Sequence, residues 1–254
     1  MENKLFDLTS KTAIVTGGGR GLGKQIAEGL AEAGANIVVC SRNLAACNEV
    51  CTQLKEQGVN ILAFSCDITK KEEIQNVIDE TIKAFGKIDI LVNNSGISWI
   101  SPVVDYPEDK WKMVMDVNVN GTFLFSQAAV REMLKQSSGK IINIASIAGH
   151  GGTPPEVMEA LAYNTSKGAV ITFTKDLALK LAKYGIQVNA IAPGFFPTKI
   201  TSKVLQSSFL KGVPAGRFGG DSDLKGAAVF LASNASDYMT GQILNIDGGI
   251  TAQA

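Results

Sequence analysis

Residues 12–23 read TAIVTGGGRGLG, and this stretch decides the fold. Its first five residues are mostly β-branched and apolar, which is typical of a buried strand. A glycine-rich run follows at once, and residues 21–33 have the pattern of a helix that Gly34 ends. Glycines between a strand and a helix permit a tight turn in which the backbone approaches a pyrophosphate at the helix N-terminus. The stretch therefore predicts a βα unit that binds a dinucleotide.

The same alternation of strand and helix patterns continues along the chain. Further strands are expected at residues 36–40, 61–66, 88–92, 140–144, 187–191 and 242–246. Long helices are expected at residues 111–133 and around Tyr163 and Lys167, the latter ending at Gly185. Strands that are apolar throughout belong to a parallel sheet covered on both faces. We therefore predict an α/β fold, a Rossmann-type doubly wound parallel sheet of seven strands flanked by helices on both faces, in a single domain of residues 1–254.

Composition excludes several classes of partner. Lys and Arg together number 24, as do Asp and Glu, and no run of like charge stands out. The chain therefore favours a small-molecule partner over nucleic acid or a membrane surface. The first residues do not resemble a signal peptide, and no apolar run reaches the about 18 residues of a membrane span, so a cytoplasmic protein is expected.

The cysteines and the histidine give little sign of a metal or disulfide framework. Four cysteines are too few to staple a chain of this length. Cys47 and Cys51 stand at helical spacing and could in principle share a metal, but the only histidine, His150, is far away in sequence. We therefore expect reduced cysteines and no metal site.

The residues after the second predicted strand bear on the choice of cofactor. An NAD enzyme usually places a carboxylate there to bind the ribose 2′-hydroxyl, whereas this chain has Ser41 and Arg42. Together with Arg20 in the glycine-rich run, Arg42 could clamp a 2′-phosphate through charge-assisted hydrogen bonds. The alternative is that Arg42 is a solvated charge at the start of a helix. The sequence thus favours NADP(H), with NAD(H) as the weaker alternative.

Tyr163 and Lys167 form a candidate acid/base pair. Four residues apart on a helix, they share one face, one turn from each other. The pKa of a free phenol is about 10, and a nearby cation lowers it by favouring the phenolate. Such a pair is common by chance, so its meaning depends on the other motifs.

Taken together, the motifs resemble those of the short-chain dehydrogenase/reductase family, and the resemblance covers nearly the whole chain. They follow in the family's order: the glycine loop 16–23, Asp67, the run Asn93-Asn94-Ser95-Gly96, Asn118, Ser146, Tyr163 with Lys167, Pro193-Gly194, and Asp247-Gly248-Gly249. The family usually has alanine at the position of Ser95, a change that should leave the turn intact.

The resemblance implies an enzyme that transfers a hydride between a nicotinamide and a ketone or secondary alcohol. Tyr163 would exchange the proton with the reacting oxygen, and Ser146 would orient that oxygen. Lys167 would hold the nicotinamide ribose and lower the pKa of Tyr163, while Asn118 would hold a water that connects Lys167 to solvent. The cofactor-binding residues implied are Gly17, Gly19, Arg20, Gly21, Leu22, Gly23, Ser41, Arg42, Asp67, Ile68, Asn94, Gly96, Tyr163, Lys167, Pro193, Gly194, Phe196 and Thr198.

Two segments are expected to shape the substrate site. Ser146 and Tyr163 are separated by 16 residues, more than the family commonly has, so residues 150–161 must bulge outward to form one wall of the site or an inert surface excursion. By resemblance, residues 195–216 form a lid, whose aromatic residues could cover an apolar chain and whose lysines could attract an acidic group or simply face solvent.

The resemblance leaves the substrate open between two classes. The general motif set is similar to that of 3-oxoacyl-acyl-carrier-protein reductases, whose substrate arrives on a carrier protein. The long segment between Ser146 and Tyr163 is similar to that of sugar-acid or polyol dehydrogenases such as gluconate 5-dehydrogenase. A sensor or scaffold that binds NADP with little catalysis is the alternative from another class. The family also implies a homotetramer, packed through the helix at 111–133 and the C-terminal residues 243–250.

Overall fold

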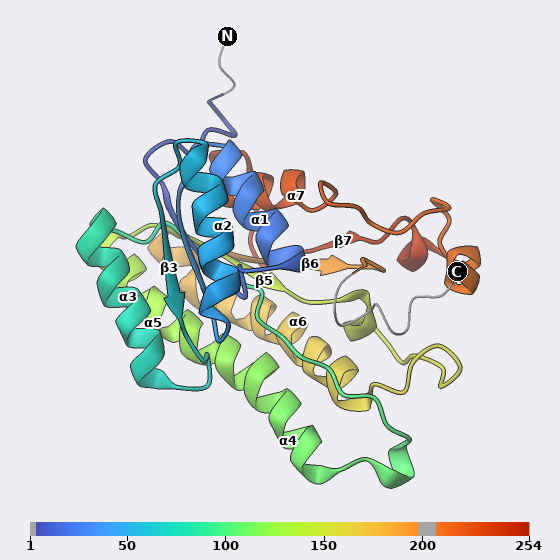
Figure 1. Cartoon of the computed structure of the whole chain (residues 1–254). Helices are drawn as coiled ribbons and strands as arrows, with labels where there is room; N and C mark the ends of the chain where they lie inside the picture. Colours follow the sequence, from blue (N-terminus) through green and yellow to red (C-terminus); the bar gives the residue numbers. More distant parts are fainter. Residues whose placement is uncertain (1–3, 198–206, 254) are drawn as a thin grey trace.

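The strands of the computed structural model, which describes residues 4–197 and 207–253, form one parallel sheet in the order β3-β2-β1-β4-β5-β6-β7 (Figure 1). This order confirms the predicted doubly wound sheet. Its strands are β1 Thr12–Thr16, β2 Asn36–Ser41, β3 Ile61–Ser65, β4 Ile90–Asn93, β5 Gly139–Ile144, β6 Ile186–Pro193 and β7 Ile243–Ile246. Each predicted strand is present, with bounds that differ by at most two residues from those expected.

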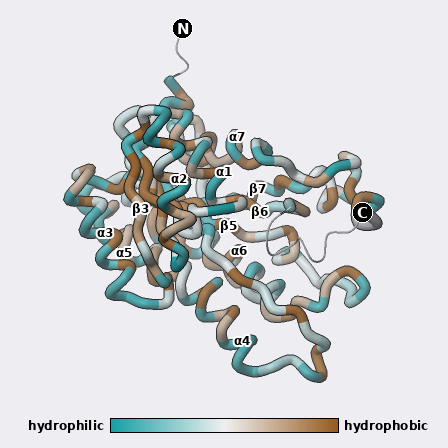
Figure 2. The backbone as a smooth tube through the Cα atoms, viewed as in Figure 1, coloured by the Kyte–Doolittle hydropathy of each residue, from teal (hydrophilic) through white to brown (hydrophobic). Residues whose placement is uncertain are grey.

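Helices cover both faces of the sheet, as the apolar strands predict. They are α1 Gly21–Glu32, α2 Leu44–Glu56, α3 Lys71–Phe85, α4 Glu108–Met115, α5 Thr122–Gln136, α6 Leu161–Leu181 and α7 Lys225–Ala232. Alternate strand residues point to opposite faces: Val15 packs in a core cluster with α1, α2 and α7, and Ile14 in a second one with α3, α5 and the end of α6. The hydrophobic strands at the centre of the molecule are visible in Figure 2.

Two helical segments differ from the sequence prediction. The helix expected at 111–133 is an α-helix interrupted by a π-helical stretch at Asp116–Gly121, and this stretch contains Asn118. A π-helical turn inside an α-helix is frequent at functional sites, because it re-aims a side chain. Helix α7 was not predicted; it has only eight residues and includes Gly226, so its pattern gives little helical signal.

The sheet order brings four loops to one edge. The chain reverses direction across the sheet between β1 and β4, and a ligand of an open α/β sheet binds outside the carboxyl ends of the strands at such a point. The loops that follow β1, β4, β5 and β6 all start at this edge, since the strands are parallel. The candidate site lies here.

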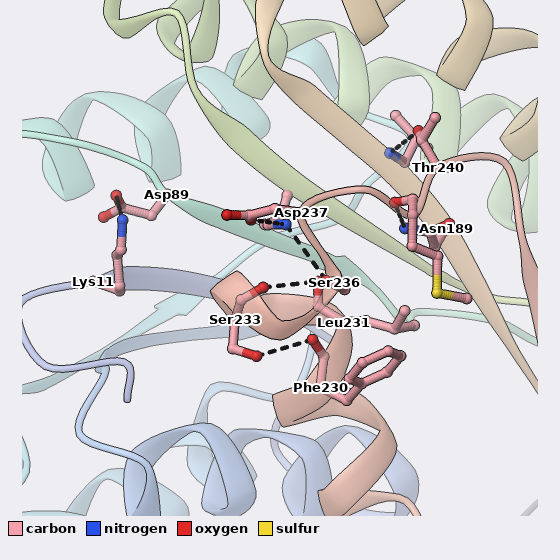
Figure 3. Close-up of polar contacts among 12 residues, drawn as sticks. Lys11, Asp89, Asn189, Phe230, Leu231, Ser233, Ser236, Asp237 and Thr240 are labelled. Carbon is pink, nitrogen blue, oxygen red and sulfur yellow. Dashed lines mark hydrogen bonds and ion pairs between the residues drawn. The ribbon is translucent and has the colours of Figure 1, made fainter. Parts of the chain in front are cut away.

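At the opposite edge of the sheet, polar contacts fix the turn between α7 and β7. Lys140, at the start of β5, is buried and donates to the Asp237 carboxylate over 2.7 Å. Figure 3 shows the neighbouring contacts, in which Ser233 bonds to the carbonyl of Phe230 and the Ser236 hydroxyl to that of Leu231. These bonds anchor the turn between α7 and β7, and therefore also the C-terminal residues that follow β7.

The four cysteines, Cys40, Cys47, Cys51 and Cys66, are buried free thiols. Within the described ranges, no helix has both the length and the apolar character of a membrane span.

Candidate active site

The glycine-rich loop makes a close turn between β1 and α1. Gly17 and Gly21 adopt positive φ angles of 65° and 53°, a region that side chains with a Cβ rarely occupy. A Cβ on Gly23 would lie 2.4 Å from the carbonyl oxygen of Gly17 and from Nδ2 of Asn94. The loop therefore requires glycine at these positions, and it presents the free backbone N–H groups at the start of α1 to an anion.

Asn94 holds this loop in place. Its Nδ2 donates to the carbonyl oxygens of Thr16 and Gly17 at 2.9 and 3.2 Å. The Thr16 hydroxyl in turn accepts hydrogen bonds from the backbone N–H groups of Asn94 and Ser95, both at 3.0 Å. The loops after β1 and β4 are thus latched together. In this structure the side chain of Asn94 shapes the cradle by binding protein atoms.

The residues expected around the adenosine end lie at the ends of β1, β2 and β3. Arg20 and Arg42 are exposed, and Ser41 closes the turn before α2 by bonding to the backbone of Asn43. Burial raises the pKa of Asp67, but two hydrogen bonds from Thr69 and the charge of Arg42 outweigh it, so the pKa lies below its ordinary value. Arg42 is therefore close enough to Asp67 to act on it electrostatically.

The other predicted cofactor contacts are less accessible. Ile68 is 5% exposed and packs against Gly121, and Leu22 packs at the edge of the core formed with α1. Phe196 is 3% exposed and belongs to the same core cluster, with its ring against Gly219, so little of its side chain can reach a ligand.

Four further positions belong to the predicted set. Pro193 ends β6, and Gly194 lies so close to Asp247 that a Cβ would be 2.7 Å from its Cα. A Cβ on Gly19 would meet the α2 backbone at Ala46. Thr198 lies outside the described residues.

Ser146, Tyr163 and Lys167 come together at the end of β5. Ser146 follows β5 and is 8% exposed, Tyr163 is half-buried in the first turn of α6, and Lys167 is 5% exposed one turn further on. The Lys167 ammonium lies 5.6 Å from the centre of the Tyr163 ring and donates to the carbonyl of Ile144 at 2.7 Å. The structure therefore brings Tyr163 and Lys167 together, with Ser146 beside them.

The pKa values of this group correct one expectation. Burial raises the pKa of Tyr163, and the hydrogen bond with Ser146 opposes that rise. Burial also lowers the pKa of Lys167 to about 8. The sequence predicted that Lys167 would lower the pKa of Tyr163. Instead desolvation raises that pKa, and the effect that opposes the rise comes from Ser146.

Asn118 is almost completely buried and connects two parts of the site. Its Oδ1 accepts from the N–H of Ile97, and its Nδ2 donates to the carbonyl of Ile97 and to the Ser166 hydroxyl, all at 2.9 Å. A Cβ on Gly96 would lie 3.4 Å from this Oδ1 and 3.6 Å from Nζ of Lys167. Asn118 thus pins the loop after β4 to α6, with its side chain beside Lys167.

A pocket of about 280 Å³ opens beside these groups, and Ser146 and Tyr163 line it. Residues 150–161 were expected to form either a wall of the substrate site or an inert surface excursion. The structure supports the wall, because the pocket lining includes Gly151, Gly152, Thr153, Pro154, Val157 and Met158. Phe195, from the expected lid segment, also lines the pocket. Residues 198–206 of that segment lie outside the described residues.

Sequence reasoning missed two segments that line the pocket. Ser98 and Ile100 come from the loop after β4, and Ile250 and Thr251 come from the C-terminal turn. The Asp247 carboxylate fixes this turn by accepting from the N–H groups of Gly249 and Thr251 and from the Thr251 hydroxyl. The motif Asp247-Gly248-Gly249 was the available signal, because a carboxylate before two glycines is typical of a capped turn.

Comparison with known proteins identifies the family. A family model described as short chain dehydrogenase matches residues 11–208. A 2-dehydro-3-deoxy-D-gluconate 5-dehydrogenase of Bacillus subtilis is 43% identical over 249 residues, 96% of each chain. A 3-oxoacyl-[acyl-carrier-protein] reductase of Synechocystis is 38% identical, over 96% of this chain and 98% of the relative.

Among solved structures, a gluconate 5-dehydrogenase from Burkholderia cenocepacia in complex with NADP and tartrate has a TM-score of 0.93 and 39% identity, with 99% of each chain covered. In this chain, the glycine loop held by Asn94 and the group of Ser146, Tyr163 and Lys167 lie on a fold that matches the fold of that enzyme. By sequence and by structure, the chain belongs to the short-chain dehydrogenase family.

Proposed function

We propose that this site transfers a hydride between a nicotinamide and a ketone or secondary alcohol, with Ser146, Tyr163 and Lys167 as the groups that handle the proton. The observation that carries the proposal is that Ser146 and Tyr163, from separate elements, line one pocket at the carboxyl edge of the sheet while Lys167 lies buried behind them. A bound nicotinamide would supply or accept the hydride. Tyr163 would give its proton to the carbonyl oxygen, and Ser146 would hold that oxygen in place.

Lys167 and Asn118 support this proton transfer from behind. The buried ammonium of Lys167 would replace the proton that Tyr163 gives up, since a pKa of about 8 lets it release a proton near neutral pH. Asn118 would keep Lys167 and the loop at Gly96 in register through its bonds to Ile97 and Ser166. A sensor or scaffold would have no need of this arrangement, which supports catalysis over that alternative.

The test is the Tyr163→Phe variant. It should retain cofactor binding and the native unfolding transition, because only one oxygen is removed, yet lose nearly all turnover. A variant that turns over substrate at close to the native rate would contradict the assignment of Tyr163.

We further propose NADP(H) as the cofactor in preference to NAD(H). The cradle fits a pyrophosphate, because Gly17 and Gly23 leave no room for side chains where the backbone must approach it. Arg20 and Arg42 are exposed at the ends of β1 and β2, where a 2′-phosphate would lie. The related gluconate 5-dehydrogenase was crystallised with NADP. We also propose that the cofactor contacts the other residues predicted around this cradle, among them Asp67, Gly96 and Gly194.

The first candidate substrate is a sugar acid or polyol. Relatives named for deoxygluconate and gluconate support it, as does the tartrate in the related crystal structure. The pocket is small, and its lining includes the hydroxyl-bearing residues Ser98, Ser146, Thr153, Tyr163 and Thr251. A compact, hydroxyl-rich substrate fits such a lining.

A 3-oxoacyl thioester, delivered by an acyl carrier protein, is the second candidate. The observation that favours it is the apolar part of the lining, which includes Ile100, Ile147, Val157, Met158, Phe195 and Ile250. None of the described lining residues carries a formal charge, so the described walls do not by themselves select an acid. Turnover of a sugar-acid and a thioester panel with NADPH or NADP would distinguish the candidates.

Assembly and location complete the proposal. We propose a homotetramer, because Met113, Phe123 and Leu134 expose apolar side chains along α4 and α5. Sedimentation of the native chain and of Phe123→Glu tests this, since a buried charge would split the assembly. We also propose that the protein is cytoplasmic, because four buried free thiols are compatible with a reducing compartment.

A further inference from the structure

Asn164 fastens the pocket wall to the helix that carries Tyr163. It lies in the first turn of α6, directly after Tyr163, and its Nδ2 donates to the Thr153 hydroxyl at 2.8 Å. Thr153 belongs to the wall formed by residues 150–161, and this wall lines the pocket together with Tyr163. The bond therefore ties the wall to the same helical turn on which the proposed proton donor stands.

Among the described residues, little else holds this part of the wall. Thr153 follows Gly151 and Gly152, and a Cβ at either glycine would meet no atom within 4 Å. Their backbone is thus not packed against a neighbouring element, and glycine is the residue with the greatest conformational freedom. Further hydrogen bonds hold the wall near its two ends, through His150 and through the carbonyl of Glu159. The bond to Thr153 therefore decides where the middle of the wall stands.

Asn164 contributes little to the stability of the fold. Its Oδ1 is buried, and no described donor lies within hydrogen-bond distance of it. Burying an unpaired carbonyl oxygen costs about as much free energy as one hydrogen bond contributes, so the two effects oppose each other. Asparagine is also a poorer helix former than alanine. The consequence of this side chain is therefore the placement of the wall rather than the stability of α6.

We propose that Asn164 is a positioning residue that sets the width of the pocket beside Tyr163, and that the site thereby selects compact ketones and secondary alcohols over bulky ones. The inference rests on the proposed hydride transfer and narrows its substrate class. With the bond in place, the wall stays close to α6 and the pocket keeps its volume of about 280 Å³. Without it, the two glycines let the wall move outward, which admits larger substrates and orients compact ones less firmly.

The test compares cyclohexanone with 4-tert-butylcyclohexanone, in the native protein and in Asn164→Ala, with NADPH. The two ketones share the reacting carbonyl and differ only in bulk away from it, and the native protein should prefer cyclohexanone. In Asn164→Ala, the ratio of kcat/KM for cyclohexanone to kcat/KM for the bulky ketone should fall about three- to tenfold, the loss expected for one hydrogen bond. KM for cyclohexanone should rise more than kcat falls, because Ser146 and Tyr163 are still present.

Thr153→Val tests the other end of the same bond. Valine has nearly the shape of threonine without the hydroxyl, so this variant should lower the ratio as Asn164→Ala does. The double variant should lower it no further than either single variant, because both changes break one and the same bond. Thr153→Ser keeps the accepting hydroxyl and should keep the native ratio.

Thr165→Val is the control on the same helix. Thr165 is exposed beside Asn164, and its hydroxyl donates to the carbonyl of Leu161 rather than to the wall, so the ratio should stay at the native value. The unfolding midpoint of Asn164→Ala should not fall below that of the native protein, because alanine removes the unpaired oxygen together with the bond. An asparagine with only a structural role would lower the midpoint and leave the ratio unchanged.

The outcomes separate the two proposals. If Asn164→Ala keeps the native ratio, if the native protein shows no preference, or if the effects of the single variants add up in the double variant, the inference is overturned while hydride transfer stands. If the native protein accepts members of the sugar-acid and thioester panel but neither ketone, the ratio is taken between the most compact and the bulkiest of those members. If it turns over none of these compounds, the proposed function fails and the inference fails with it.

Discussion

Lys167 donates its hydrogen bond to the carbonyl of Ile144, the last residue of β5, over 2.7 Å. This bond links α6 to the strand that carries Ser146 at its end. The ammonium is nevertheless buried, and burial lowers its pKa to about 8. The lysine therefore changes its charge within a pH range in which most lysines remain protonated.

Lys167 should reduce the stability of the protein in a pH-dependent manner. Its pKa is about 8 when folded and 10.5 when unfolded, so between these values the unfolded state binds more protons and the free energy of unfolding rises with pH. The full effect amounts to roughly 3 kcal/mol. In the cofactor-free protein, Lys167→Met should be more stable than native at pH 7 and lose this advantage toward pH 10.5.

Denaturant unfolding at several pH values measures the difference. Lys180→Met is the control, since Lys180 is exposed in a surface ion pair with Asp176 and should show little pH-dependent difference from native. A difference between Lys167→Met and native that stays constant over this range would contradict the lowered pKa.

Ser146→Ala should shift the pH dependence of alcohol oxidation toward higher pH. Burial raises the pKa of Tyr163, and the hydrogen bond from Ser146 opposes the rise, so its loss raises the pKa further. Oxidation needs the phenolate as base, and its rate therefore increases as pH rises through this pKa. The rate of alcohol oxidation, measured against pH for both proteins with saturating cofactor, tests this shift.

Ser146→Ala should also lower kcat, because the reacting oxygen loses a hydrogen-bond donor.

Arg42→Ala should weaken binding of NADP(H) and leave that of NAD(H) nearly unchanged. The loss of charge-assisted hydrogen bonds to a 2′-phosphate corresponds to about 10–100-fold in Kd. Titration calorimetry with both cofactors measures it, and Arg131→Ala on α5 is a control outside the cradle. Equal affinity for the two cofactors, in native and variant alike, would rule out the 2′-phosphate clamp.

Alanine at two helical glycines should have opposite effects. In Gly23→Ala the new Cβ would clash with Gly17 and Asn94, so cofactor binding should be lost and stability should fall by about 1–3 kcal/mol. In Gly226→Ala the Cβ meets nothing within 4 Å in α7, and stability should rise by about 0.5–1 kcal/mol. Thermal unfolding and cofactor titration of both variants check this pair. A Gly23→Ala variant with native affinity would refute the close approach.

The sheet was predictable because parallel strands carry a strong local signal. An apolar run such as Thr12–Thr16 followed by a glycine turn defines both the strand and its burial, and its predicted bounds match the structure. Helix α7 was missed because it has only eight residues and no side-chain cap marks its start. The π-helical stretch at Asn118 was missed because nothing in its local sequence specifies a π turn.

The candidate site, too, was predictable only in part. Ser146, Tyr163 and Lys167 could be brought together from motif and topology, because each stands at a defined place in a βα unit. Burial decides their pKa values, and burial is a property of the whole fold, so the raised pKa of Tyr163 could not be read from its spacing to Lys167. Ser98 and Thr251 could not be placed in the pocket lining from the sequence, because they lie on loops that meet only in the folded structure.

The turn that Asp247 caps has a practical consequence for handling the protein. Because Ile250 and Thr251 belong to the pocket wall, a purification tag fused directly after residue 254 would begin within a few residues of the bound substrate. The chain near Leu5 instead lies against the segment at Ala235, away from that wall (Figure 1). Tags and surface immobilisation belong at the amino end, and a carboxyl-terminal fusion should be cleaved before kinetic parameters are compared.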